Sequence, residues 1–359
     1  MASPYRLLAW ISTLVIFAPV SPAQSYRVTD LGTFPGGTVS QGQAINDCGD
    51  VVGYARFANF NAHGFLWSPR LGLQDIGAIL PQTNFSVAQA INSSGVVAGY
   101  STYDYPPLLN EHAVLWIDGR IRDLGTFPGS NISEATGIND PGEVVGFSVP
   151  HAFLWSRHEG MRDLGTLPGG GYSQALAINA RGEVVGYSDA AHGNWHGFVW
   201  TRFKGMQPLP FLSGDNSASA NGINDRGQIV GGSGKGFSRE FAVLWDRHDG
   251  GDGENLDGED FRVESLGALP GQGWSTAFAI NDRGQVVGWS GFRAFLWSRK
   301  EGIQDLNNLI PENSGWTLIL PTAINARGQI TGQGNLNGQS HAFLLTPGFD
   351  PPWRCDDRR

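Results

Sequence analysis

One motif recurs seven times along the chain and constrains the fold more than any other feature. An Ile-Asn pair is followed by a Gly three residues after the Asn and by a second Gly four residues later. The Asn residues stand 40 to 57 residues apart, at Asn46, Asn92, Asn139, Asn179, Asn224, Asn281 and Asn325. A repeat of this period is typical of solenoids and β-propellers, in which each unit buries its faces only against neighbouring units.

Each unit is predicted to hold four short strands, here called A to D. In the fourth unit, residues 174–179 (QALAIN) predict strand A, residues 183–188 (EVVGYS) strand B and residues 197–201 (GFVWT) strand C, with a strand D upstream at residues 161–167 (MRDLGTL). The A–B turn places a Gly where a positive φ is needed, and the Asn side chain is expected to bond the turn backbone. We therefore interpret the repeated Asn as structural.

The two ends of the repeat region complement each other. Residues 151–155 (HAFLW) are apolar on both faces, as expected for a strand buried between stacked sheets. Residues 26–32 (YRVTDLG) supply a strand D with no A to C before it, and residues 341–346 (HAFLLT) supply a strand C with no D after it. We predict an all-β fold: a seven-bladed β-propeller of four-stranded antiparallel blades, its ring closed by the N-terminal strand pairing with the last repeat.

The chain begins with a segment typical of a secretory leader. Arg6 precedes an apolar run over residues 7–20, and small residues lead up to Ala23. Residues 1–23 are predicted to be a signal peptide, residues 24–349 the propeller and residues 350–359 a C-terminal tail. We expect a secreted protein, extracellular or periplasmic, with no membrane span in its mature form.

The net charge argues against a nucleic-acid partner, and the glycine content favours an all-β structure. The formal net charge is −9 and the isoelectric point is near 5.3, whereas a nucleic-acid partner would require a basic face. Charged residues are sparse at 16%, and 51 glycines favour short strands and tight turns. We therefore expect no nucleic-acid partner.

The two cysteines are expected to lie on one face of the ring. Cys48 falls in the A–B turn of the first unit, and Cys355 falls in the tail that follows the last strand C. Both positions emerge on the same side of neighbouring blades, and secreted proteins often pair such cysteines. We predict a Cys48–Cys355 disulfide that fastens the ring.

Two short motifs resemble those of the HAF-repeat family of predicted bacterial extracellular proteins. His-Ala-Phe stands at residues 151–153 and 341–343, with variants at residues 63–65, 112–114, 196–198 and 293–295. A D-L-G-T-[LF]-P-G-G signature stands at residues 30–37 and 163–170. The resemblance covers nearly the whole chain after the leader. It implies an exported repeat protein, and it brings no catalytic residue or cofactor with it.

Two groups of residues are of types that commonly bind metal ions. The His residues of the HAF motif stand one per unit, too far apart to share a metal, so we predict a hydrogen bond at the start of strand C. The insert at residues 246–261 carries glycine-spaced carboxylates, which could hold Ca²⁺ or form a solvated acidic loop. The candidate calcium ligands are Asp249, Asp252, Glu254 and Asp257.

The remaining candidate site is the face that bears the D–A and B–C loops, here called the loop face. Aromatic side chains there could stack on sugars, or they could be core packing. The candidates are Phe85, Tyr103, Tyr105, Tyr172, Trp195, Trp274 and Trp289. We predict a monomeric, non-enzymatic binding module that contacts an extracellular glycan or protein through this face. A secreted hydrolase or lyase with a loop-borne active site, and a structural or surface-assembly protein, are the alternatives.

Overall fold

A computed structural model describes residues 25–59, 61–80, 85–103, 110–236, 240–247 and 261–348. The predicted signal peptide, Tyr105, Cys355 and the four candidate calcium ligands lie outside these ranges. In the described part of the chain, no helix is long and apolar enough to span a membrane.

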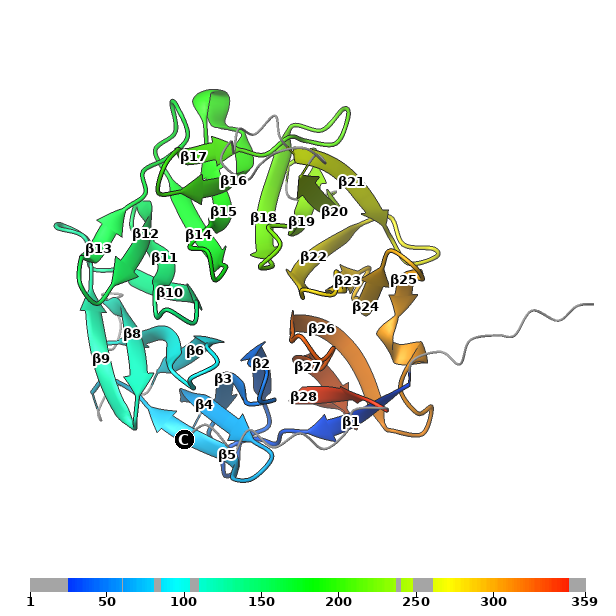
Figure 1. The fold of residues 1–359 in the computed structure, drawn as a ribbon. Helices are drawn as coiled ribbons and strands as arrows, with labels where there is room; N and C mark the ends of the chain where they lie inside the picture. Colours follow the sequence, from blue (N-terminus) through cyan, green and yellow to red (C-terminus); the bar gives the residue numbers. More distant parts are fainter. Residues whose placement is uncertain are drawn as a thin grey trace, which may run out of the picture.

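The chain forms seven four-stranded antiparallel sheets arranged in a ring (Figure 1). Blade 1 consists of β2 (Ser40–Ile45), β3 (Val51–Arg56), β4 (Ala62–Ser68) and β5 (Gly72–Gly77). Blade 2 consists of β6 (Ser86–Ile91), β7 (Val97–Thr102), β8 (Glu111–Ile117) and β9 (Arg120–Gly125). Blade 3 consists of β10 (Ser133–Ile138), β11 (Val144–Ser148), β12 (His151–Ser156) and β13 (Gly160–Asp163). Blades 4 and 5 consist of β14 (Ser173–Ile178), β15 (Val184–Asp189), β16 (Trp195–Thr201) and β17 (Gly205–Pro208); and β18 (Ser217–Ile223), β19 (Ile229–Gly234), β20 (Glu240–Arg247) and β21 (Phe261–Gly267). Blade 6 consists of β22 (Ser275–Ile280), β23 (Val286–Ser290), β24 (Arg293–Ser298) and β25 (Gly302–Asp305). Short 3-10 helices follow β15 and β25, at η1 (Ala191–Gly193) and η3 (Leu306–Asn308).

Blade 7 joins the two ends of the repeat region, as predicted. It contains β26 (Trp316–Ile324), β27 (Ile330–Leu336) and β28 (Gln339–Pro347), and its fourth strand is β1 (Tyr26–Asp30). β1 pairs antiparallel with β28 from Tyr26 opposite Pro347 to Asp30 opposite Phe343. The predicted seven-bladed propeller with an N-terminal closing strand is therefore confirmed.

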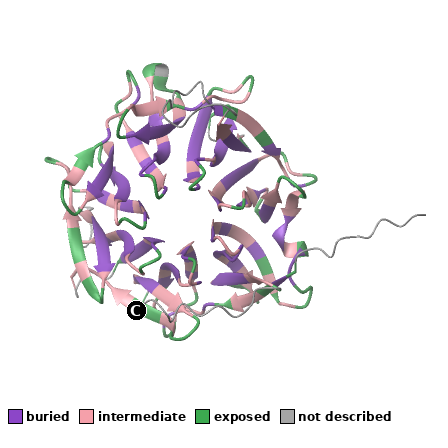
Figure 2. Ribbon diagram, viewed as in Figure 1, coloured by how far each residue is buried: buried purple, intermediate pink, exposed green. Residues whose placement is uncertain are grey.

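The hydrophobic core lies between blades rather than within a single layer. Strands A line the axis and strands D form the rim (Figure 1), and the buried residues follow the middle of every sheet (Figure 2). One core cluster joins Leu115 of blade 2 to Phe153 and Trp155 of blade 3. Ala152 and Leu154, on the opposite face of β12, pack in the next cluster towards blade 4. Both faces of strand C are therefore buried, as the HAFLW pattern predicted.

The two glycines of the motif serve different purposes. Gly182 lies in the A–B turn at φ +76°, a conformation that disfavours other residues. Gly186 lies in strand B, where a Cβ would overlap the carbonyl group of Gln174 in strand A. Strand A carries a β-bulge at this level, between Ala175 and Ala177. The second glycine thus allows the bulged strand to approach its neighbour closely.

Strand D is shorter than predicted. In blade 3 it ends at Asp163 rather than at Leu167. The Asp163 carboxylate accepts a hydrogen bond from the backbone N–H of Gly165 at 2.7 Å, and Gly165 takes φ +69°. This local turn leads the chain out of the sheet and towards the next blade.

Candidate functional site

On the face that bears the A–B turns, the repeated asparagines form a ring of hydrogen bonds around the axis. The Nδ2 of each repeated Asn donates a hydrogen bond to the backbone carbonyl of the Asn in the next blade, at 2.9 to 3.4 Å. The last of these bonds runs from Asn325 back to Asn46 and completes the circle. The Asn Oδ1 accepts from the turn backbone, as in Asn179, which receives the N–H groups of Arg181 and Glu183. The turn-bonding interpretation is confirmed, and the amide also joins neighbouring blades.

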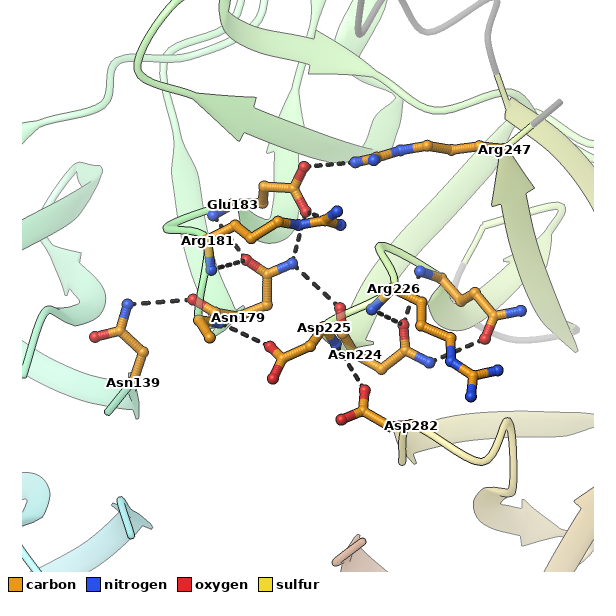
Figure 3. A network of polar contacts seen from close by, with 11 residues as sticks. Asn139, Asn179, Arg181, Glu183, Asn224, Asp225, Arg226, Arg247 and Asp282 are labelled. Atoms are coloured by element: carbon orange, nitrogen blue, oxygen red, sulfur yellow. Dashed lines mark hydrogen bonds and ion pairs between the residues drawn. The ribbon is translucent and has the colours of Figure 1, made fainter. Parts of the chain in front are cut away.

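Charged side chains reinforce this ring in blades 4 and 5 (Figure 3). Asn179 Nδ2 also donates to Glu183 Oε2 at 2.6 Å, and Arg247 pairs with the other oxygen of Glu183 at 2.5 Å. Burial raises the pKa of Glu183, but the Asn179 amide and the guanidinium groups of Arg247 and Arg181 lower that pKa overall. This carboxylate therefore stays ionised, and the two guanidinium groups balance its charge within the blade interface.

The axial opening on the same face offers little for a ligand. A cavity of about 240 Å³ is lined there by turn residues of all seven blades. Its four aspartates each accept a backbone N–H from the preceding blade, at 2.8 to 2.9 Å: Asp47, Asp140, Asp225 and Asp282. Among the described residues no group of three His, Cys, Asp or Glu could hold a metal ion. The polar groups of this face are used to join blades.

Four of the five HAF histidines make the hydrogen bond that was predicted for them. In four blades the His Nδ1 lies 2.9 to 3.0 Å from an Asp of strand D in the same blade: His63 with Asp75, His112 with Asp123, His151 with Asp163, and His341 with Asp30. His196 differs because Pro208 occupies the Asp position, and its ring packs on Phe211 instead, with centroids 4.6 Å apart. Burial lowers the pKa of His196.

Two predicted aromatic residues of blade 4, Tyr172 and Trp195, form a polar cluster on the loop face with Tyr187, which was not a candidate. The ring centroid of Trp195 lies 5.8 Å from that of Tyr172 and 5.4 Å from that of Tyr187. The Gln174 side chain joins the two tyrosines: its Nε2 donates to the Tyr172 hydroxyl, and its Oε1 accepts from the Tyr187 hydroxyl, both at 2.5 Å. We call these four residues the blade 4 cluster. All four are partly exposed.

The predicted aromatic residues of blade 6 form a second, apolar cluster with Phe292. The rings of Trp274, Trp289 and Phe292 are mutually perpendicular, with centroids 4.8 to 5.7 Å apart. Phe292 is 68% exposed at the tip of the β23–β24 hairpin. We call these three residues the blade 6 cluster.

The other two described candidates join neither cluster. The Phe85 ring lies 6.1 Å from that of Tyr100 at the start of blade 2. The Tyr103 hydroxyl donates to Asp123 Oδ2 at 2.5 Å, and its ring lies 4.5 Å from that of His112. Tyr103 is thereby bound to the His–Asp pair of its own blade.

Three partly buried glutamates on the loop face, Glu111, Glu134 and Glu240, were not among the site residues predicted from the sequence. Glu111 and Glu240 begin strand C in blades 2 and 5, and each reaches strand A of the next blade. Glu111 shares a hydrogen bond with Glu134, and Glu240 accepts one from Thr276. A sequence signal did exist, because the residue before each HAF-type motif varies widely: Ala62, Glu111, Pro150, Trp195, Glu240, Phe292 and Ser340.

The Glu111–Glu134 pair predicts a pH-dependent stability. Burial and the neighbouring Glu111 raise the pKa of Glu134 to about 7, above its unfolded value near 4.3. The pair therefore contributes stability below pH 4, and that contribution is lost as the pH rises through 7. Glu134→Gln is expected to be more stable than the parent above pH 8 by about 1–3 kcal/mol. Urea unfolding at pH 5 and pH 9 checks this, and an equal effect at both pH values would contradict it.

Comparison with known proteins supports the fold of the chain and assigns it to no family. No family model and no curated protein sequence matches the chain. It is similar in structure to the extracellular domain of a putative one-component system from B. thetaiotaomicron, with 9% identity, a TM-score of 0.53, and coverage of 89% of this chain and 40% of that chain. A gluconolactonase from Xanthomonas campestris shows 9% identity, a TM-score of 0.44, and coverage of 92% and 96% respectively.

The likeness is one of fold. At 9% identity, the likeness to the B. thetaiotaomicron domain supports a β-propeller similar to bacterial propeller domains and carries over no activity. The chain also spans only about two fifths of the length of the B. thetaiotaomicron structure, at 40%. Membership of the HAF-repeat family stays a prediction from the motifs.

Proposed function

We propose that this protein is a non-enzymatic binding module whose loop face binds a glycan. The observation that carries the proposal is the blade 4 cluster, in which Trp195 and two tyrosines surround one amide side chain. Aromatic faces supply stacking area, and the hydroxyl and amide groups supply hydrogen bonds. Small-ligand sites typically combine these two kinds of group. The A–B turn face offers no such arrangement, because its polar groups bond neighbouring blades.

The hydrogen bonds of the cluster favour binding because they hold it in place before a ligand arrives. Gln174 bridges Tyr172 and Tyr187, and Trp195 packs edge-on against both rings. A side chain already fixed in the unbound protein loses little conformational entropy when it contacts a ligand. Partial exposure leaves part of each ring open to solvent.

Trp195→Ala is expected to weaken glycan binding by about 1–3 kcal/mol, since the substitution removes stacking area and frees both tyrosines. A glycan array with the purified protein would identify ligands, and calorimetry would compare affinities. Phe203→Ala is a matched control, because Phe203 is 97% exposed in the C–D turn of the same blade, on the opposite face. If no array hit depends on Trp195, the proposal fails.

A hydrolase or lyase is the second candidate, and the Glu111–Glu134 pair favours it. Two carboxyl groups in direct contact share a proton, and such a pair can act as acid and base on a water molecule in hydrolysis. The pKa of Glu134, raised to about 7, would make it the acid of the pair, and burial also raises the pKa of Glu111. Reducing-end release from the glycans found on the array would test this idea. Release that is abolished in Glu134→Gln would favour the enzyme over the binding module.

We further propose that the protein acts outside the cytoplasm as a monomer, on the strength of its leader-like N-terminus and closed ring. Mass analysis of protein exported by a bacterial host should show cleavage after Ala23. The same measurement under non-reducing conditions tests the predicted disulfide. Cys48 is disulfide-bonded, but its predicted partner Cys355 lies outside the described residues.

A further inference from the structure

Blade 5 departs from the other blades at one position on the loop face. Near the end of strand B, the other blades carry a large side chain: Tyr54, Tyr100, Phe147, Tyr187, Trp289 and Gln333. Blade 5 has Gly232 at this point, and any side chain there would collide with the carboxylate of Glu240. The glycine therefore makes room for a carboxylate in a place where other blades hold an aromatic ring.

The Glu240 carboxylate lies beside the blade 6 cluster. It accepts a hydrogen bond from the hydroxyl of Thr276, which stands directly opposite Trp289 in the β22–β23 ladder. Residues opposite each other on antiparallel strands have Cβ atoms about 5 Å apart. No cationic side chain among the described residues forms an ion pair with Glu240. Partial burial raises the pKa of Glu240, and the hydrogen bond from Thr276 offsets this rise only in part.

One residue of the blade 6 cluster, Phe292, has a strained backbone conformation. Gly291 and Phe292 take φ +54° and +67° at the tip of the hairpin. Equivalent two-residue turns elsewhere in the chain use residues suited to this geometry, Asp118-Gly119 and Asn337-Gly338. A bulky residue at positive φ is a genuine outlier. Because Phe292 is also largely exposed, burial in the core does not explain a bulky residue at this turn, and such an outlier points to a functional contact.

We propose that Glu240 and the blade 6 cluster bind the ammonium group of an amino sugar within the glycan. An ammonium group would pair with the carboxylate and also lie against aromatic faces, which attract cations. The sugar ring would contact the exposed side of Phe292. This inference rests on the proposed glycan binding and adds that the glycan carries free amines. The blade 4 cluster, with its amide and hydroxyl groups, would hold the uncharged hydroxyls of the same chain.

Calorimetry of the full chain with two oligosaccharides of equal length tests the proposal, one of glucosamine and one of N-acetylglucosamine. The glucosamine oligomer is expected to bind about tenfold more tightly, as for one charge-assisted contact. Glu240→Gln should abolish that preference, so that the two oligomers bind with equal affinity. Glu301→Gln, in the C–D turn of blade 6 on the opposite face, should keep the preference. Thermal melting confirms that both variants fold.

Three outcomes would overturn the amine site. They are equal affinity for both oligomers, an unchanged preference in Glu240→Gln, and polylysine binding that matches the glucosamine oligomer at equal charge. Trp289→Leu provides a second variant, which should also reduce the preference because it removes one aromatic face. Failure of the proposed function would give a different result, because no glycan would then show binding that depends on Trp195.

Discussion

Asn179→Asp is expected to destabilise the propeller by about 3 kcal/mol, although it changes one NH₂ group to an oxygen. The Asn179 Nδ2 donates to the Asn224 carbonyl at 3.1 Å and to Glu183 Oε2 at 2.6 Å, and the residue is 3% exposed. The Asp carboxylate would face both acceptors with no proton to donate. It would also place a second negative charge against Glu183. Urea unfolding at pH 7 measures the loss.

Asn281→Asp is the matched control for this prediction. Asn281 makes the same bond to the next blade, at 2.9 Å to the Asn325 carbonyl, but its partner within the blade is Gln285 rather than a glutamate. The Gln285 amide can rotate and donate to the new carboxylate, so we expect a loss of only about 1–2 kcal/mol. The difference between the two variants should shrink as the pH falls, because the new carboxylate and Glu183 would face each other and take up a proton that removes one of the two charges. Equal losses at pH 7 would contradict the role assigned to Glu183.

Most of the architecture could be predicted from the sequence because it depends on local, repeated chemistry. The Gly182 turn and the apolar faces of residues 151–155 each recur in nearly the same form along the chain. The incomplete units at the two ends then left one way to close the ring. The sequence also held an unused signal for the inter-blade bonds: all seven positions are Asn and none is Asp. An Asp would cap the turn as well, but it could not donate to the next blade.

The candidate site was less predictable because it is assembled from residues that do not repeat. Glu240 reaches Thr276, the partner of Trp289 in the β22–β23 ladder, only because Gly232 leaves space and because blades 5 and 6 stack in one particular way. Glu111 and Glu134 are 23 residues apart and meet across a blade interface. Neither arrangement leaves a spacing that a motif search can find. Aromatic residues were identified because their type alone suggests a role, whereas a glutamate gains its role from its surroundings.

Removing the closing strand is expected to have the largest effect of all. A chain that begins at Gly32 lacks the whole of β1 and loses its pairing with β28. It also loses Tyr26 and Leu31, which are 2% and 3% exposed and belong to two core clusters on either side of blade 7. Burial of such side chains contributes about 1.5–3 kcal/mol each, so the two together, at about 3–6 kcal/mol, reach the lower end of the 5–15 kcal/mol that holds a typical domain folded. We expect loss of the cooperative thermal transition.

A chain that begins at Ser25 keeps β1 and is the matched control, with an unchanged transition expected. Because β28 would be left as an unpaired edge in the shorter chain, a synthetic peptide of residues 25–32 should bind there and restore the transition. The restored melting temperature should rise with peptide concentration, since the peptide binds only the folded ring. A shorter chain that melts within a few degrees of the control would show that six complete blades and three strands hold the ring without β1. In that event the core between blades, rather than the closing strand, would be what keeps the propeller shut.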